Sequence, residues 1–197
     1  MRRFKTSRTR NFKAAADGDA ADEDLSEEAR SERAKEREKE IEIAAVRLLS
    51  RREHSKEELR RKLISKGHPE ASVVAVVEKL GSERQVSDER FAASYVHHHA
   101  QRGKGPVRIR AVLRQQGITD PQIQQEVGAA DMDWNQLAGE VRRRKFGADL
   151  PKTPGERAKQ ARFLQYRGFN SDQIRAALNF DPDMDIEPDG ASGPDHS

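Results

Sequence analysis

The side chains of this sequence that could contact another molecule are mostly basic. The densest run is Arg142–Lys145, four consecutive cations. On a helix such a run covers most of one turn, so some of its members must face solvent. One interpretation is contact with phosphate groups or with an acidic protein surface. The alternative is a solvated helix end before Gly147, where cations are favoured by the helix dipole.

A second basic group surrounds the short segment Gly103–Gly105. This segment lacks the glycine spacing and the Lys-Ser/Thr ending of a phosphate-binding loop, so a turn between helices is predicted. The Gly105-Pro106 step predicts a helix start, whose positive end could hold a phosphate or a carboxylate. The eight candidate contact residues for a partner or for DNA are Arg102, Lys104, Arg108, Arg110, Arg142, Arg143, Arg144 and Lys145.

Neither a metal site nor a catalytic site is predicted. His97–His99 are consecutive, and neighbours on a helix point about 100° apart, so the three rings cannot converge on one ion. No histidines have the i,i+4 spacing of helical zinc ligands, and the chain has no cysteine. There is no nucleophile elbow and no plausible pairing of nucleophile and base. We therefore expect no cofactor and no enzymatic activity.

The composition argues against one large core. Of 197 residues, 36% are charged and 34% hydrophobic, and the mean hydropathy is −0.98. The longest apolar run is Val73–Val77, against the ~20 residues of a membrane span, so we expect a soluble cytoplasmic protein. Net charge is zero over residues 1–40, +9 over 41–180 and −6 over 181–197. The basic middle could attract polyanions or an acidic protein.

Three glycines reveal a repeat of about fifty residues. Each of Gly67, Gly117 and Gly168 follows a helical pattern, as a left-handed helix cap does. Apolar residues recur four residues before, six after and ten after each glycine. These residues are Leu63, Leu113 and Leu164, then Val73, Ile123 and Ile174, then Val77, Val127 and Leu178. A further amphipathic helix precedes each pair, and units this poor in apolar residues are expected to stack on one another.

The predicted fold is therefore all-α, a tandem array of three three-helix repeats, about nine helices, elongated or curved. Helix starts are predicted at Asp120-Pro121 and at two capping boxes, Ser55–Glu58 and Thr153–Glu156. The expected organisation is a disordered tail over 1–25, a charged helical extension over 26–40, repeats over 41–84, 85–130 and 131–180, and an acidic disordered tail over 181–197.

Three stretches resemble the RecX family, the bacterial regulators of the RecA recombinase. They are AAVRLLSRREHSKEELRRKLISK at 44–66, VSDERFAASYVHHHAQRGKGPVRIRAVLRQQGI at 86–118 and KQARFLQYRGFNSDQI at 159–174. Together they span about 41–180 in the family's order. Both tails lie outside the match, and the histidine-rich His97–His99 departs from the family's pattern.

The resemblance implies an all-helical tandem and a non-enzymatic partner role. RecX proteins bind RecA filaments on DNA, lodge in the filament groove and inhibit ATP hydrolysis and strand exchange. On this basis we expect a monomer that binds the RecA filament, with weak contact to single- or double-stranded DNA. The alternative is a helical protein that binds DNA directly and without sequence preference; a scaffold that bridges proteins is a third possibility.

Overall fold

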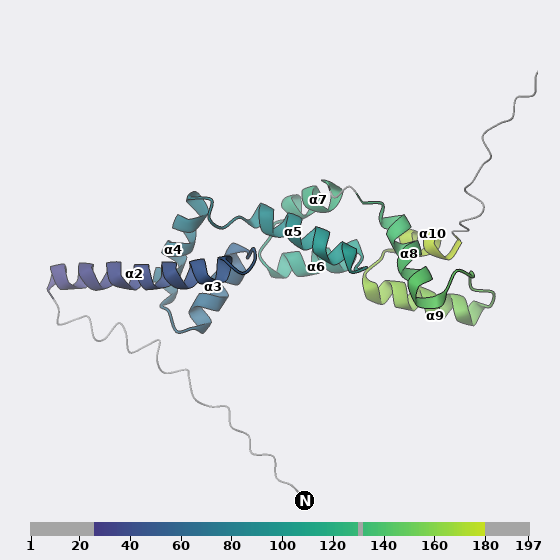
Figure 1. Ribbon diagram of the computed structural model, residues 1–197, viewed down its shortest axis with the longest axis horizontal. Helices are drawn as coiled ribbons and strands as arrows, with labels where there is room; N and C mark the ends of the chain where they lie inside the picture. Colours follow the sequence, from purple (N-terminus) through teal and green to yellow (C-terminus); the bar gives the residue numbers. More distant parts are fainter. Residues whose placement is uncertain (1–25, 130–131, 180–197) are drawn as a thin grey trace, which may run out of the picture. The chain divides into compact units, whose positions relative to one another are not determined.

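The computed structural model describes residues 26–129 and 132–179, and the two predicted tails lie outside these described residues. The described residues form helices and no strand (Figure 1). The helices are α2 (Glu27–Leu49), α3 (Lys56–Ser65), α4 (Glu70–Ser82), α5 (Asp88–Gln101), α6 (Pro106–Gln115), α7 (Asp120–Ala129), α8 (Trp134–Phe146), α9 (Pro154–Arg167) and α10 (Ser171–Asn179). The prediction of nine helices is confirmed for this part of the chain.

Two compact units divide the helices between them. Unit 1 contains the described residues up to Ser94 together with Leu113–Ile123, and unit 2 contains Tyr95–Val112 together with the described residues from Gln124 onward. The division falls within α5, α6 and α7. The predicted repeat boundaries at 84/85 and 130/131 stay a prediction.

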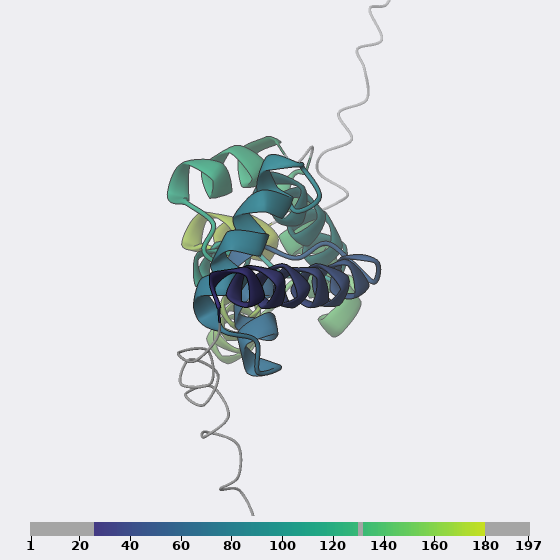
Figure 2. The same ribbon diagram turned by 90° about the vertical axis from the view of Figure 1, so that its left-hand side faces the viewer.

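Unit 1 is built around the helices α2, α3 and α4. Its core consists of fully buried aliphatic side chains, among them Ile41, Leu59, Leu63 and Val77. The first part of α2, up to Glu40, is almost entirely exposed, and the predicted bounds of the charged extension, 26–40, stay a prediction. In Figure 1 this part of α2 extends beyond α3 and α4, and Figure 2 shows the same helix in front of them.

In unit 2, α10 packs against α8 and α9. The leucine of the third repeat copy, Leu164, is fully buried, as are its counterparts Leu63 and Leu113 in unit 1. The three repeat glycines all have positive φ, at +93° for Gly67, +80° for Gly117 and +93° for Gly168. The repeat therefore marks real helix ends, because this conformation favours glycine.

The two predicted capping boxes have different outcomes. Thr153 forms the complete box, since its hydroxyl accepts from the Glu156 N–H and the Glu156 carboxylate accepts from the Thr153 N–H. Ser55 also caps its helix, accepting from the Glu58 N–H at 3.0 Å. The Glu58 carboxylate, however, contacts Arg52 and His54 instead of completing the box, because it is drawn to these basic groups.

Candidate partner and nucleic-acid interface

The turn that joins α5 to α6 is seated on the C-terminal end of α9. The Gly105 N–H donates to the Arg167 carbonyl at 2.9 Å, and the Val107 N–H donates to the Gly168 carbonyl at 3.0 Å. A Cβ atom at Gly105 would lie 2.3 Å from the Gly168 carbonyl oxygen. The backbones therefore meet at a distance that only glycine permits, and Arg102 and Lys104 are carried on a fixed turn.

This seating changes the predicted role of the α6 helix start. The sequence suggested that backbone amides there could hold an anion. In the structure the amides of Gly105 and Val107 already donate to carbonyls of α9, and Pro106 has no N–H to offer. An anion at this place would therefore be held by side chains and not by these amides.

Four basic side chains gather around the turn, and we call them the α6–α9 cluster. They are Arg102, Lys104, Arg108 and Arg167. Arg108 Nη1 donates to the Tyr166 carbonyl at 3.2 Å, and Arg167 Nη1 donates to the Arg102 carbonyl at 3.4 Å. Backbone carbonyls thus anchor two of the four.

The electrostatics of the α6–α9 cluster are repulsive. The pKa of Lys104 lies below its ordinary value, first because of burial and then because of the positive charges of Arg108, Arg102 and Arg167. Within residues 26–129 and 132–179, no carboxylate forms an ion pair with any of the four side chains. Bringing an anion to this place would relieve the repulsion.

The histidine run lies beside this cluster. The pKa of His99 is lowered to about 4, first by burial and then by the nearby charges of Lys104, His98 and Arg102. The His99 ring packs on Tyr95 with centroids 4.0 Å apart, whereas the His97 ring meets the side chain of Gln101. The rings therefore have different surroundings. No group of three potential metal ligands converges anywhere among the residues that the structure describes.

The structure divides the basic run of α8 into two kinds of residue. Arg142 is buried at 3% exposure, and its guanidinium donates to the Asp149 and Ala148 carbonyls at 2.7 and 2.9 Å. Its pKa is lowered by burial and then by Arg143, against the opposing effect of Asp149. Arg142 therefore holds the segment that follows α8.

The other three members of the run, Arg143, Arg144 and Lys145, are exposed. Of these, Arg144 lies 3.9 Å from Glu140 in a solvent-exposed pair. Val141, just before the run, is buried at 6% exposure. Val141 therefore faces the core of unit 2, while three of the four cations in the run face outward.

The last candidate, Arg110, is half-buried, and its Nη2 donates to Gln124 at 3.4 Å. Sequence reasoning missed two neighbours of the candidates, Arg167 and Tyr166. A signal for Tyr166 existed, because the other repeat copies have Ser65 and Gln115 at the same offset before the glycine.

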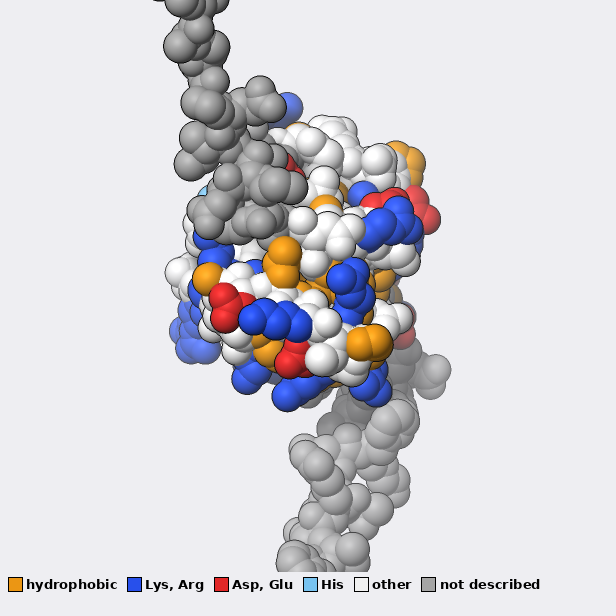
Figure 3. All heavy atoms as spheres, turned by 90° about the vertical axis from the view of Figure 1, so that its right-hand side faces the viewer, with side chains coloured by type: hydrophobic (Ala, Val, Ile, Leu, Met, Phe, Trp, Pro, Cys, Tyr) orange, Lys and Arg blue, Asp and Glu red, His pale blue; other side chains and the backbone are white. Residues whose placement is uncertain are grey.

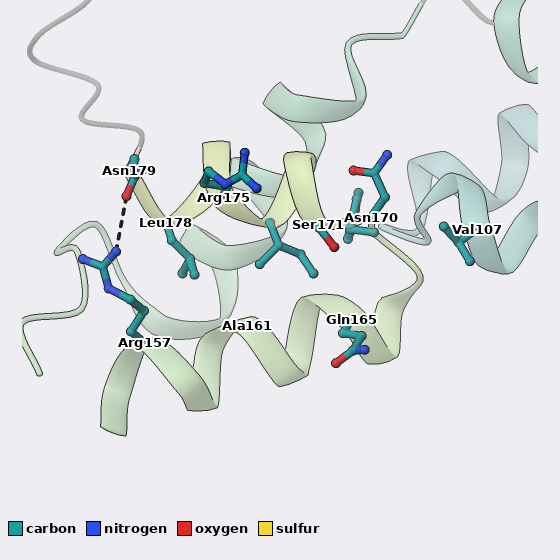
Figure 4. A pocket seen from close by; sticks show the side chains of 11 residues that line it. Val107, Arg157, Ala161, Gln165, Asn170, Ser171, Arg175, Leu178 and Asn179 are labelled. Atoms are coloured by element: carbon teal, nitrogen blue, oxygen red, sulfur yellow. Dashed lines mark hydrogen bonds between the residues drawn. The ribbon is translucent and has the colours of Figure 1, made fainter. Parts of the chain in front are cut away.

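An apolar groove runs between α9 and α10 in the same unit. Its volume is about 610 Å³, and its apolar lining includes Val107, Phe169 and Leu178. Figure 4 shows Arg157 bonded to Asn179 at one end of the groove and Val107 at the other. Figure 3, which views unit 2 from the side of α8, α9 and α10, shows apolar side chains among many Lys and Arg and a few Asp and Glu.

Comparison with known proteins gives consistent matches along the chain. Residues 43–80, 87–126 and 133–178 match the models of the first, second and third three-helix domains of RecX. The Regulatory protein RecX of Halorhodospira halophila is 46% identical over 134 residues, covering 68% of this chain and 83% of that protein. The Regulatory protein RecX of Pseudomonas savastanoi is 41% identical, covering 68% of this chain and 87% of that protein.

Solved structures match in fold. The crystal structure of RecX from Lactobacillus salivarius aligns with a TM-score of 0.61 at 21% identity, covering 73% of this chain and 95% of that one. A second crystal structure of a regulatory protein RecX gives a TM-score of 0.65 at 22% identity, covering 78% of each chain. Among the described residues, no helix is both long enough and apolar enough to span a membrane. The three domain matches in order, together with relatives above 40% identity, establish that this chain belongs to the RecX family.

Proposed function

We propose that this protein is a non-enzymatic regulator that binds RecA filaments on DNA and inhibits their ATP hydrolysis and strand exchange. Membership of the RecX family supports the proposal. The observation that carries it on this chain is the α6–α9 cluster, in which Lys104 lies among Arg102, Arg108 and Arg167. A repulsive group of cations on a fixed turn is suited to binding a phosphate backbone or an acidic protein surface.

The contact surface of this proposal combines two places on unit 2. One is the α6–α9 cluster and the other is the exposed part of the α8 run, Arg143–Lys145. Arg142 is left out of the contact surface because it is buried against backbone carbonyls. Long-range attraction by such cations raises the rate at which the protein associates with a negatively charged filament.

In this proposal the protein works as a monomer in the cytoplasm. It also contacts bare DNA weakly and without sequence preference, because contacts to phosphates carry no direct information about the base sequence. Its affinity for DNA should fall steeply as the salt concentration rises, since binding releases counterions from the nucleic acid.

The deciding experiment is the ATPase activity of RecA on single-stranded DNA, titrated with this protein. We expect inhibition well below one regulator per RecA protomer, and a parallel loss of strand exchange. An inactive control should be this same protein heated beyond its melting transition. Unchanged ATPase and strand exchange at equimolar protein would contradict the proposal and favour the alternative, a protein that acts directly on nucleic acid.

A further inference from the structure

Residues 180–189, which follow the last described residue, have the strictly alternating sequence FDPDMDIEPD. Apolar residues occupy the even positions, from Phe180 to Pro188, and acidic residues occupy the odd positions, from Asp181 to Asp189. Successive side chains of an extended chain point to opposite sides, so these residues would form one apolar edge and one acidic edge when extended. We call residues 180–189 the alternating segment.

The groove between α9 and α10 has one end where the described part of the chain stops. Asn179 lines this end of the groove and accepts a hydrogen bond of 3.4 Å from Arg157 (Figure 4). Val107 lies at the other end and is 50% exposed. Apolar surface in contact with water is unfavourable, so a segment that covered the groove would stabilise unit 2.

The charges around the groove complement the acidic edge of the alternating segment. Arg157 and Arg175 both line the groove, and both are exposed. Arg175 lies 3.4 Å from Asp172, but the side chains of this pair are 71% and 82% exposed, so both remain open to solvent. The described residues of unit 2 have a net charge of +8, whereas residues 181–197 have −6. A basic surface attracts an acidic segment that is tethered to it.

The alternating segment is long enough to follow the whole groove. The nine residues of α10 make a helix about 13 Å long, whereas ten extended residues reach about 33 Å. A segment that starts at Asn179 and runs back along α10 therefore passes Val107. The next residue after Val107 is Arg108, a member of the α6–α9 cluster, so Glu187 and Asp189 can reach these cations.

From this fit we propose that the alternating segment docks in the groove of its own chain, with its apolar edge against α9 and α10 and its acids near Arg157, Arg175 and the α6–α9 cluster. The tether favours this occupant, because a segment attached at one end of the groove has an effective concentration of about 1 mM. One consequence rests on the proposed function: the docked segment competes with the RecA filament for the cations of the cluster.

The docking is tested on the full chain without RecA. The sequence contains no cysteine, so Ala191→Cys provides a single attachment site for a nitroxide just beyond the alternating segment. In the docked chain the nitroxide should broaden the backbone amide NMR signals of Val107 and Phe169, at the far end of the groove. Reduction of the nitroxide should restore both signals, and the amide of Val74 in unit 1 serves as the reference.

The matched control exchanges two adjacent pairs of residues in the nitroxide-labelled chain. Met184→Asp with Asp185→Met, and Ile186→Glu with Glu187→Ile, keep the composition, length and net charge but abolish the alternation. The broadening at Val107 should be lost in this chain. Equal broadening in both chains would overturn the inference, because an undocked segment would then account for it.

A second control separates docking within one chain from docking between chains. Unlabelled chains that carry the nitroxide are mixed with isotope-labelled chains that lack it. Broadening at Val107 should be absent from this mixture. If the mixture gave the same broadening, the segment would dock on a second copy, and docking within its own chain would be overturned.

The consequence for RecA has its own measurement. The exchanged chain should inhibit the RecA ATPase at a concentration about threefold or more below that of the wild type, because its cluster is accessible in a larger fraction of the molecules. Equal inhibition by the two chains would overturn the competition. If neither chain inhibited RecA, the proposed function would fail, and the nitroxide experiment would still decide whether the segment docks.

Discussion

Many cations of unit 1 lie against carboxylates. Among the described residues of unit 2, only Arg144 and Arg175 form such pairs, and several other cations contact backbone carbonyls or aromatic rings instead. In unit 1, Arg52 and Lys62 contact Glu58, Lys79 contacts Glu42 and Arg90 contacts Glu53. In unit 2, Arg142 donates to two carbonyls, Arg108 covers Tyr166 and Arg167 covers Phe163. Neutralised charges attract no polyanion, so the two units differ in what they can bind.

The charge counts of the described residues agree with this difference. Unit 1 carries 17 Lys and Arg against 16 Asp and Glu, and unit 2 carries 14 against 6. The net charges are +1 and +8. The basic middle of the sequence is therefore a property of unit 2, although both units are rich in arginine.

The largest expected effect concerns two equivalent glycines. Gly67 in unit 1 and Gly168 in unit 2 share a φ of +93°, but nothing lies within 4 Å of a Cβ at Gly67, whereas a Cβ at Gly168 would overlap Arg108. Alanine in this conformation costs about 1 kcal/mol at either position. We expect Gly67→Ala to lower the free energy of unfolding by about 1 kcal/mol. Gly168→Ala should lower it by about 3 kcal/mol, because α6 must also move away from α9.

Urea unfolding followed by circular dichroism measures both costs. If the two substitutions were equally costly, the close approach of α6 to α9 would not exist in solution. The fixed position of the α5–α6 turn on α9 would then lose its support.

The next prediction compares exposed arginines of the two units. Replacing both Arg143 and Arg144 by Glu should weaken inhibition of RecA about tenfold or more, because like charges would then meet across the interface. The melting temperature should change little, since exposed charges contribute within about 0.5 kcal/mol. The matched control replaces Arg47 and Arg51, two exposed arginines of unit 1, by Glu with the same change in net charge.

Paired measurements of melting and of filament ATPase inhibition decide this case. A large fall in melting temperature would show that Arg143 and Arg144 hold the fold. Unchanged inhibition would make the run a solvated helix end and leave the α6–α9 cluster as the contact. An equal loss of ATPase inhibition in both double variants would show that the exposed arginines of unit 2 are no more important for binding than those of unit 1.

A smaller effect is expected from pH through His99 in unit 2. Its pKa of about 4 in the folded chain, caused first by burial and then by nearby cations, lies below the ordinary value of 6.5. The unfolded chain therefore takes up a proton first, so stability present above about pH 6.5 is lost as the pH falls toward 4. His99→Phe should flatten this part of the melting profile.

Unit 1 provides the internal comparison for the pH profile. Burial also lowers the pKa of His54, against the opposing charge of Glu58. His99→Phe should therefore remove only part of the acid sensitivity of the whole chain. A profile identical to the wild type's would show that His99 is not buried in its neutral form.

The smallest effect is expected from an exposed ion pair of unit 1. Arg114 Nε lies 2.6 Å from Asp120 Oδ1, and both side chains are more than half exposed. Arg114→Gln should cost less than about 1 kcal/mol in stability, because such pairs are solvated and screened. RecA inhibition should stay as in the wild type. A loss comparable to that of the Arg143 and Arg144 variant would place contact residues in unit 1 as well.

Much of the fold could be predicted from local patterns. The glycines at positive φ, the buried leucines and the Thr153 cap all follow from rules that act within a few residues. The capping box predicted at Ser55 is incomplete because the Glu58 carboxylate contacts Arg52 and His54 instead of the Ser55 N–H. The spacing rule considers only the N–H as a partner. A spacing rule holds where no other group nearby competes for the same side chain.

The candidate site was predicted less completely. Charge and spacing indicated the turn around Lys104 and the run of α8, but not that Arg142 would be buried while its neighbours are exposed. Which member of a run turns inward depends on the segment that packs over it, here the carbonyls of Ala148 and Asp149. Arg167 and Tyr166 could be assigned to the site only from the tertiary structure, which shows the end of α9 beside α6.

The sequence by itself determined the helical repeat, the family and the lack of a strand pattern, because periodicity, caps and glycines act over short distances along the chain. Only the tertiary structure decided which cations are neutralised and which remain available. That outcome depends on pairs far apart in sequence, such as Arg90 with Glu53 in unit 1 and Arg108 with Tyr166 in unit 2. The net charge of a sequence is only a sum. The attraction of a folded protein for a charged ligand depends on which side chains have no opposite charge nearby after packing.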